Sequence, residues 1–348
     1  MLQMIDENRT PAHWAEKTKF QAARAINPSD SNTEGLRVAL INNMPDPALE
    51  DTESQFFNLL DVAADTVPVH VKLFSLPGIP RGENGRAHLA SSYCDFQELF
   101  ESRFDGVIIT GTEPHQPDLK QEAYWPCLVE LFSWAEENTS SAVLSCLAAH
   151  AAVLQGDGIR RHRLADKKFG IFDEWKLTDH FLIKEASEPL RFPHSRWNEL
   201  REDALAAAGY SLLTKSSQAG VNLFVKKRRN SLFVHFQGHP EYGAGTLAKE
   251  FRRDVKRFLR KERETYPTLP HGYFDTVKMR ALGEFREKAL REPHDRLMSQ
   301  FPEQGLNGTG ESVWRSAATS VYRNWLQYLT LNKASRVRSA VASPFAGG

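Results

Sequence analysis

Four short apolar runs in the first 150 residues most constrain how this chain can fold. They lie at residues 38–41, 69–74, 104–111 and 142–145. Apolar runs of this length are typical of strands buried inside a sheet. Between them, residues 51–64 and 124–137 carry apolar side chains at helical spacing. This alternation predicts an α/β protein with three layers, a mostly parallel sheet with helices on both faces.

The pattern changes after Gly156. We expect an edge strand at 169–172 and antiparallel strands at 210–214, 221–225 and 232–236, the last two joined by a basic turn at 226–230. Loops are predicted at 78–90 and 192–196, and helices near 96–100, within 242–263 and at 313–331.

These elements divide the chain into four parts. We expect an N-terminal arm at 1–36 with one short helix at 12–25, a main domain at 37–263, a polar insertion at 264–312, and a C-terminal helix at 313–348 whose tail frays after Lys333.

Composition excludes several classes of function. The chain has 44 basic and 44 acidic residues, so no net field favours a nucleic acid or an anionic membrane. Its three cysteines are an odd number at irregular spacing, which indicates reduced thiols in the cytoplasm and no metal cluster. No apolar run approaches the roughly 20 residues that span a bilayer. We therefore expect a cytoplasmic protein with small-molecule partners and no permanently bound cofactor.

Cys146 is the candidate nucleophile. The apolar run 142–145 ends at this residue, and a segment rich in alanine follows. A cysteine at such a strand-to-helix turn lies at a helix N-terminus, which favours the thiolate. The alternative is an inert core cysteine. The Leu147 N–H is the natural oxyanion donor, and the loop around Thr112 is placed to supply a second.

His239 and Glu241 supply the other groups that thiol chemistry needs. They follow the predicted strand 232–236, so they can arrive at the same sheet edge as Cys146. A histidine is the usual base for such a thiol, and a carboxylate can orient its ring. His150, one turn beyond Cys146, is the competing base, although its alanine neighbours favour a packed position.

Several motifs together resemble the homoserine O-acyltransferases of methionine biosynthesis, the succinyltransferase type. They are Asn-Met-Pro at 43–45, Thr-Glu-Ser-Gln-Phe at 52–56, Phe-Asp-Gly at 104–106, Tyr-Trp-Pro at 124–126, Lys-Lys-Phe-Gly at 167–170, Pro-His-Ser-Arg at 193–196, Gly-His-Pro-Glu-Tyr at 238–242, Glu-Phe-Arg-Arg-Asp at 250–254, and Trp-Arg-Ser and Asn-Trp-Leu near the end. The resemblance implies a fold like that of class I glutamine amidotransferases, which is flavodoxin-like, and a homodimer.

The resemblance also implies a ping-pong mechanism. Cys146 would take an acyl group from succinyl-CoA or acetyl-CoA as a thioester, with His239 as base and Glu241 orienting it. Lys167 and Arg253 match the family's amino-acid-binding positions, and Ser195 matches a position linked to substrate choice. Their chemistry fits, because a guanidinium and an ammonium suit an α-carboxylate.

One position breaks the family's pattern. Where a glycine goes with succinyl-CoA and a glutamate with acetyl-CoA, this chain has His115. An imidazole could pair with a succinyl carboxylate, or its bulk could restrict the site to acetyl, and we favour succinyl. The alternative functions are a glutamine amidotransferase or γ-glutamyl hydrolase, disfavoured because the Cys146 turn has no glycine, and a non-catalytic paralogue.

Overall fold

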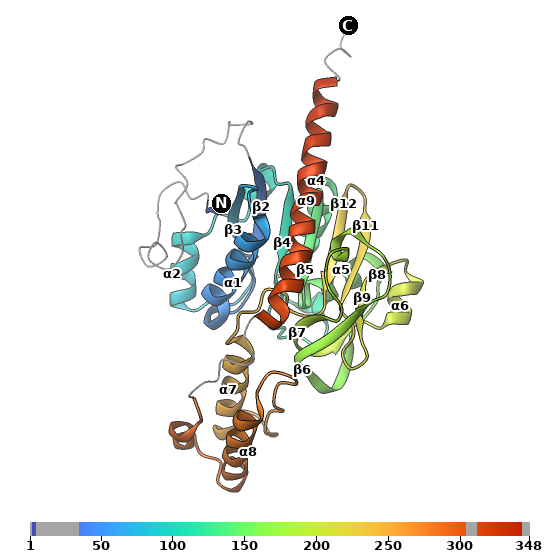
Figure 1. Cartoon of the computed structure of the whole chain (residues 1–348). Helices are drawn as coiled ribbons and strands as arrows, with labels where there is room; N and C mark the ends of the chain where they lie inside the picture. The colour runs from blue at the N-terminus through green and yellow to red at the C-terminus, as the bar shows by residue number, and fades with distance from the viewer. Residues whose placement is uncertain (1, 5–34, 304–311, 343–348) are drawn as a thin grey trace.

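An eight-stranded sheet forms the centre of the computed structural model, which describes residues 2–4, 35–303 and 312–342 (Figure 1). The strand order is β1-β3-β2-β4-β5-β12-β11-β8. The bounds are β1 Leu2–Met4, β2 Leu36–Ile41, β3 Val69–Phe74, β4 Gly106–Ile109, β5 Ser141–Ser145, β8 Ser211–Leu212, β11 Leu223–Arg228 and β12 Ser231–Phe236. The first six strands in this order run parallel, and β11 pairs antiparallel with both of its neighbours, β12 and β8.

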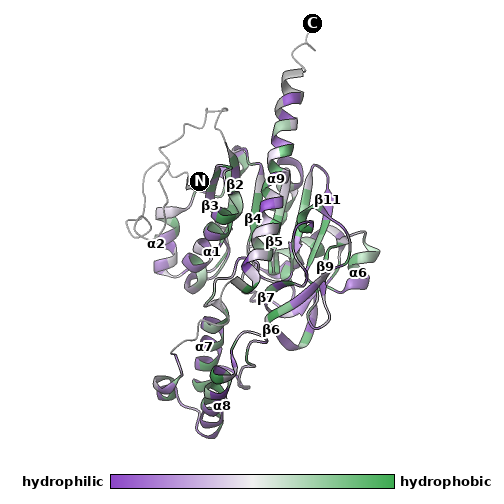
Figure 2. Ribbon diagram, viewed as in Figure 1, coloured by the Kyte–Doolittle hydropathy of each residue, from purple (hydrophilic) through white to green (hydrophobic). Residues whose placement is uncertain are grey.

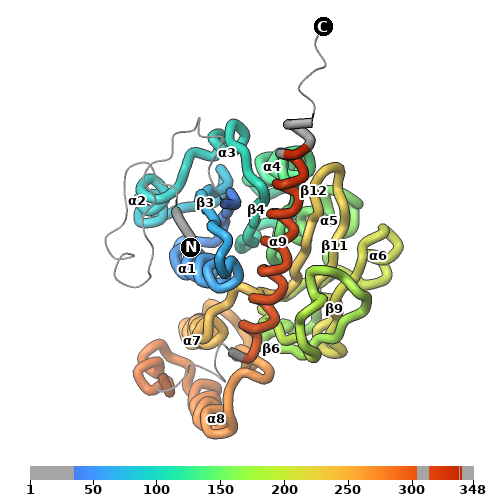
Figure 3. The backbone as a smooth tube through the Cα atoms, turned by 45° about the horizontal axis from the view of Figure 1, so that its top comes forward, coloured from blue at the N-terminus to red at the C-terminus, as the bar shows by residue number. Residues whose placement is uncertain are grey.

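Helices cover both faces of this sheet. One face packs against α1 (Asp46–Ala64) and α9 (Ser312–Ala342), and Figures 1 and 3 both show α9 crossing it. The other face packs against α3 (Glu98–Glu101), α4 (Trp125–Asn138) and α5 (Leu147–Asp157). Figure 2 shows hydrophobic residues gathered on the central strands. The predicted three-layer α/β class is confirmed.

The neighbouring strands β5 and β12 position the catalytic candidates. They pair in parallel, with Phe236 opposite Ser145. Cys146 follows β5 directly, and His239 comes three residues after β12. Both therefore emerge at the carboxyl edge of the sheet, where open α/β sheets bind their ligands.

A second, antiparallel sheet has the order β10-β9-β6-β7. Its strands are β6 His162–Lys176, β7 Leu190–Glu199, β9 Thr214–Ser216 and β10 Gly220–Val221. Two predictions were wrong here, because 169–172 lies inside a long central strand and 192–196 belongs to β7. Phe192, His194 and Arg196 are all buried, so they alternate as strand residues do. The Pro-His-Ser sequence had suggested a turn.

Several boundaries also differ from prediction. Helix α1 begins at Asp46 rather than near residue 51, with a proline in its first turn. The predicted loop 78–90 contains most of α2 (Glu83–Ser92), whose start is held by the Asp46 carboxylate, which accepts from Gly82 N at 2.7 Å. That contact joins residues 36 positions apart and leaves no local signal. The turn between β11 and β12 is reduced to Arg229 and Asn230.

Beyond β12, α7 (Thr246–Leu259), α8 (Thr276–Arg291) and the short η3 (Asp295–Gln300) form a separate apolar cluster with Trp314. Helix α9 continues past Lys333, where fraying was predicted, to Ala342. The helix predicted at 12–25 lies outside the described residues. The remaining short helices are η1 Leu119–Gln121, η2 Phe181–Ile183 and α6 Glu202–Ala207. Among the described helices, none is long and apolar enough to cross a membrane.

Candidate active site

Cys146 occupies a strained turn between β5 and α5. Its backbone angles are φ 50° and ψ −110°, a positive-φ conformation that costs a residue with a side chain about 1–3 kcal/mol. The Cys146 N–H donates to the Phe236 carbonyl at 2.8 Å, which ties the turn to β12. The predicted strand-to-helix turn is therefore present, and the thiol is half-buried at its tip.

His239 lies between Cys146 and Glu241. Its Nδ1 bonds to the Glu241 Oε1 at 2.8 Å, so Nε2 is the nitrogen left for the Cys146 sulfur. Burial opposes a charged ring, but the charges of Cys146 and Glu241 and the side-chain bonds to both raise the pKa of His239 well above its usual value. Such a pair favours a thiolate beside an imidazolium. The Tyr242 ring stacks on the imidazole at 4.2 Å between centroids.

Ser145, the residue before the nucleophile, also holds the carboxylate. Its Oγ donates to Glu241 Oε1 at 3.2 Å, and both side chains are buried. Glu241 is therefore fixed from β5 as well as by its own loop. This contact joins residues 96 positions apart, so the sequence offered no signal for it.

The predicted oxyanion donors lie close to one another. A Cβ on Gly111 would be 3.1 Å from the Leu147 amide nitrogen, so the loop after β4 packs directly against the start of α5. Leu147 is buried and Thr112 is half-buried. Backbone N–H groups from both segments can therefore point at a carbonyl oxygen bound beside Cys146.

The three predicted substrate-binding residues converge on Glu250, which the sequence analysis missed. Lys167 Nζ lies 3.3 Å from Glu250 Oε2, Ser195 Oγ donates to the same oxygen, and Arg253 Nη2 lies 4.0 Å from it. Tyr242 OH donates to Oε1 at 2.5 Å, linking this cluster to His239. The available signal was spacing, because Glu250 and Arg253 are three residues apart on α7.

The charge of Glu250 is well compensated. Burial alone would raise the pKa of its carboxyl, but the Lys167 charge, the bonds from Ser195 and Tyr242, and the Arg253 charge together hold that pKa below its usual value. Lys167 and Arg253 also contact Asp254, at 3.5 and 3.2 Å. We call Lys167, Ser195, Glu250, Arg253 and Asp254 the acceptor cluster.

His115 lies apart from these residues. Its side chain is 58% exposed, and its Nδ1 is 4.0 Å from Glu122 Oε2, the ion-pair partner recorded for it among the described residues. The loop is anchored through its backbone, because the N–H groups of His115 and Gln116 donate to Glu122 Oε1 at 2.6 Å.

Two arginines near Cys146 were also missed. Burial lowers the pKa of Arg196 and of Arg161, and the electrostatic influence of Cys146 opposes that shift in both. Arg196 is buried and bonded to backbone carbonyls, whereas Arg161 is half-buried. Within the described part of the chain, no ion pair or hydrogen bond holds the Arg161 guanidinium. The available sequence signals were the cluster of basic residues between 160 and 168 for Arg161 and the Pro-His-Ser-Arg motif at 193–196 for Arg196.

Two further buried histidines, His150 and His235, have structural surroundings. His150 Nε2 lies 3.0 Å from Gln237 Oε1, and burial together with Arg196 and Arg161 lowers its pKa to about 3. His235 stacks on Phe224, and burial lowers its pKa to about 3 as well. Neither ring is suited to act as a base near neutral pH.

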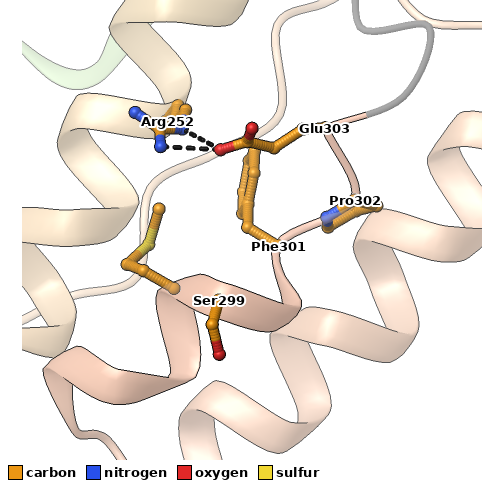
Figure 4. A pocket seen from close by; sticks show the side chains of 6 residues that line it. Arg252, Ser299, Phe301, Pro302 and Glu303 are labelled. Carbon is orange, nitrogen blue, oxygen red and sulfur yellow. Dashed lines mark hydrogen bonds and ion pairs between the residues drawn. The ribbon is translucent and has the colours of Figure 1, made fainter.

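No metal site accompanies these groups in the described residues, where no cluster of three or more His, Cys, Asp or Glu could hold an ion. A surface pocket of about 740 Å³ lies between α7 and the segment after η3 (Figure 4). The Arg252–Glu303 ion pair, at 2.6 Å, lies against it. None of the residues that line it belongs to the acceptor cluster or to the Cys146–His239–Glu241 group, so we do not assign it to the candidate site.

Comparisons with known proteins identify the family to which this chain belongs. A family described as homoserine O-succinyltransferase matches residues 4–336. The homoserine O-succinyltransferase of Rhodopseudomonas palustris is 42% identical over 292 residues, 84% of this chain and 87% of the relative. That of Bradyrhizobium japonicum is 43% identical over 300 residues, 84% of this chain and 90% of the relative.

Among solved structures, a glutamine amidotransferase from Thermotoga maritima has a TM-score of 0.47 and 14% identity, covering 85% of this chain and 99% of its own. At that similarity it adds nothing to the assignment of the site.

Proposed function

This chain belongs to the homoserine O-succinyltransferase family, and we propose that it transfers the succinyl group of succinyl-CoA to the hydroxyl of homoserine. It is an acyltransferase of methionine biosynthesis. The observation that carries the proposed chemistry is the Cys146–His239–Glu241 arrangement, joined through Tyr242 to the acceptor cluster.

In the first half-reaction, Cys146 attacks the thioester carbonyl of the acyl-CoA. His239 Nε2 takes the thiol proton, and Glu241 holds the ring through Nδ1. The negative oxygen that forms on the carbonyl is stabilised by the N–H groups of Leu147 and the Thr112 loop. When this intermediate collapses, the CoA thiolate leaves and takes the proton from His239. Cys146 then carries the acyl group as a thioester.

In the second half-reaction, His239 takes the proton of the acceptor hydroxyl. The oxygen attacks the Cys146 thioester, and the thiolate of Cys146 leaves as the new ester forms. Cys146 is an uncharged thioester at this stage, so Glu241 is the group that still raises the pKa of His239 and favours transfer of the hydroxyl proton to the ring.

The acceptor cluster matches the charges of an amino acid. We assign the α-carboxylate to Arg253, whose side chain is half exposed, with Lys167 beside it, and the α-ammonium to Glu250. These groups form ion pairs with one another. A bound zwitterion replaces their ion pairs with pairs of its own, which lowers the desolvation cost of binding.

For the donor, we propose that Arg161 receives the terminal carboxylate of a succinyl group. Its guanidinium is half-buried and close enough to Cys146 for their charges to interact. His115 stays a candidate for donor selection through its loop, which is anchored on Glu122. Glu122 also acts electrostatically on Arg161.

Intact-mass spectrometry tests the proposal directly. Incubation with succinyl-CoA and no acceptor should add one succinyl group, and the adduct should be absent in Cys146→Ala and kept in the matched variant Cys127→Ala. Homoserine should then discharge it. A protein that is labelled only by acetyl-CoA would refute the succinyl assignment. A protein that is labelled by neither but hydrolyses glutamine would refute the transferase and favour an amidotransferase.

We also propose a cytoplasmic homodimer whose main domain spans residues 37–263. Light scattering at working concentration tests the oligomeric state, and a mass equal to one chain would contradict it.

A further inference from the structure

A buried polar network lies directly beneath the loop that carries His239. Its centre is Glu174 on β6, which is 0% exposed and has three side-chain partners. His194 lies 3.0 Å from one carboxylate oxygen, and Thr214 and Asn222 donate to the other at 2.6 and 3.1 Å. We call these four residues the Glu174 network. None of them has a role in the mechanism above.

The network holds two consecutive backbone amides of the catalytic loop. Asn222 Oδ1 accepts from Gly238 N at 2.7 Å, and the carbonyl of Pro193, beside His194, accepts from His239 N at 2.8 Å. The fit at Gly238 is close, since a Cβ there would lie 2.7 Å from the Pro193 oxygen and 3.1 Å from His194 Cε1. The loop at Gly238 therefore packs directly against Asn222 and His194 of the network.

The same strand reaches the acceptor cluster. Ser195 follows His194 on β7 and donates to Glu250. Strand β7 thus contacts both the base, through Pro193, and the acceptor cluster, through Ser195.

For His194 and Asn222, the surrounding groups determine which atom donates in each hydrogen bond of the network. Arg196 Nε donates to His194 Nδ1 at 3.3 Å, and because a guanidinium cannot accept, the His194 proton must sit on Nε2 and point at Glu174. Asn222 must turn its NH₂ to Glu174, because its oxygen accepts from Gly238. Glu174 therefore faces two fixed donors, His194 Nε2 and the Asn222 NH₂, together with the Thr214 hydroxyl, which donates to a carboxylate and can accept from a protonated carboxyl.

This arrangement is costly to maintain. Burial raises the pKa of Glu174 to about 8, since the bonds from Thr214 and Asn222 and the charge of Arg196 offset it only in part. A proton on Glu174 would have one acceptor, the Thr214 hydroxyl, since His194 and Asn222 can only donate to Glu174. Retention of an ionisable group in such a place is typical of a positioning or functional role rather than of a contribution to stability.

We propose that the Glu174 network positions His239 against Cys146. The inference rests on the proposed function, because it assigns His239 as the base. Glu174 is a positioning residue that acts through Asn222, Pro193 and the loop backbone and touches no substrate.

Glu174→Gln tests this assignment. The amide keeps one acceptor oxygen but turns an NH₂ toward His194. To accept from it, His194 must move its proton to Nδ1, where that proton faces the Arg196 donor. The decisive readout is the pH profile of Cys146 alkylation by iodoacetamide, which reports the thiolate–imidazolium pair and requires no acyl transfer. We expect the midpoint to move by roughly one pH unit, and Cys146 succinylation to slow by about 10–100-fold, as when other outer partners of a reacting group are removed.

Asp157→Asn is the matched control. Asp157 accepts from Tyr210 and Lys226 at the far end of α5, so its loss should leave the alkylation profile unchanged. A folded Glu174→Gln variant with the wild-type profile would overturn the proposal, as would equal shifts in both variants. If Glu174→Gln does not fold, Thr214→Val removes one donor and decides by the same criteria. If the wild type forms no acyl adduct, the transferase fails, while the alkylation profile still tests the network.

Discussion

Glu250→Gln should impair binding of the acceptor and leave formation of the acyl-enzyme nearly unchanged. Glu250 is the meeting point of Lys167, Ser195, Tyr242 and Arg253, and it is the anion that we assign to the substrate ammonium. The variant keeps the shape of the side chain and removes its charge. Its amide can accept through only one oxygen, so an NH₂ comes to face either the Tyr242 hydroxyl or the side shared by Ser195 and the Lys167 ammonium, which can only donate.

The expected magnitude follows from the bond that is lost. A hydrogen bond to a charged partner contributes about 1.5–3 kcal/mol, and a loss of about 2 kcal/mol in acceptor binding corresponds to roughly a 30-fold rise in KM for homoserine. The acyl-enzyme forms before the acceptor binds, so single-turnover labelling by succinyl-CoA should change less than about 3-fold.

Steady-state kinetics with varied homoserine and rapid-quench labelling with succinyl-CoA measure the two effects. Asp254→Asn is the control, since Asp254 also pairs with Lys167 and Arg253 but has no recorded bond to Tyr242 or Ser195. We expect a smaller rise in KM there. Equal losses in labelling and in KM would refute the assignment, because they would show that Glu250 shapes the whole site. An unchanged KM would refute the ammonium assignment.

Three further predictions follow from the other groups. His239→Ala should slow labelling by at least about 100-fold, the usual loss for a general base, and near-normal labelling would exclude this role. Arg161→Gln should raise KM for succinyl-CoA by about 10-fold and leave KM for acetyl-CoA nearly unchanged; equal changes with both donors would refute the carboxylate contact. His235 has a folded-state pKa of about 3 against 6.5 when free, so the unfolded chain binds the extra proton and stability should fall as pH drops from 6.5 toward 3. His235→Phe should flatten the slope of unfolding free energy with pH over that window by up to about 1.4 kcal/mol per unit, while the exposed His115→Gln should not, and equal slopes in all three proteins would contradict the assigned shift.

The fold class and the meeting of Cys146 with His239 could be predicted because their causes are local. Apolar runs mark buried strands, and residues that directly follow parallel strands arrive at one sheet edge. The expectation that both residues reach one sheet edge did not require β5 and β12 to be neighbours. Their pairing is what brings His239 within bonding distance of Cys146. The family resemblance then supplied Lys167, Ser195 and Arg253, which the structure brings together.

The partners of those residues could not be predicted in the same way. Arg161 appeared as an ordinary charge in a basic segment, and Glu250 only as one letter of a family motif. Only packing shows that Glu250 has four side-chain partners and that Arg161 lies near a thiol. The misassigned loop at 192–196 has the same origin. Its polar residues suggested a solvent-exposed segment, whereas His194 is buried against Glu174, 20 positions away, and the buried Arg196 donates to His194 and to backbone carbonyls.

The hydrogen bond from Cys146 N to the Phe236 carbonyl has a consequence for how activity appears during synthesis. Ser145 and Glu241 are 96 positions apart, and the strand that delivers His239 must insert between β5 and β11 before the thiol meets its base. A nascent chain that has completed only the first five strands of the main sheet carries a cysteine with no base beside it. Long-range pairings of this kind form late in folding. In the mechanism that we propose, Cys146 therefore gains its base only when β12 pairs with β5, so incomplete chains should not react with acyl-CoA.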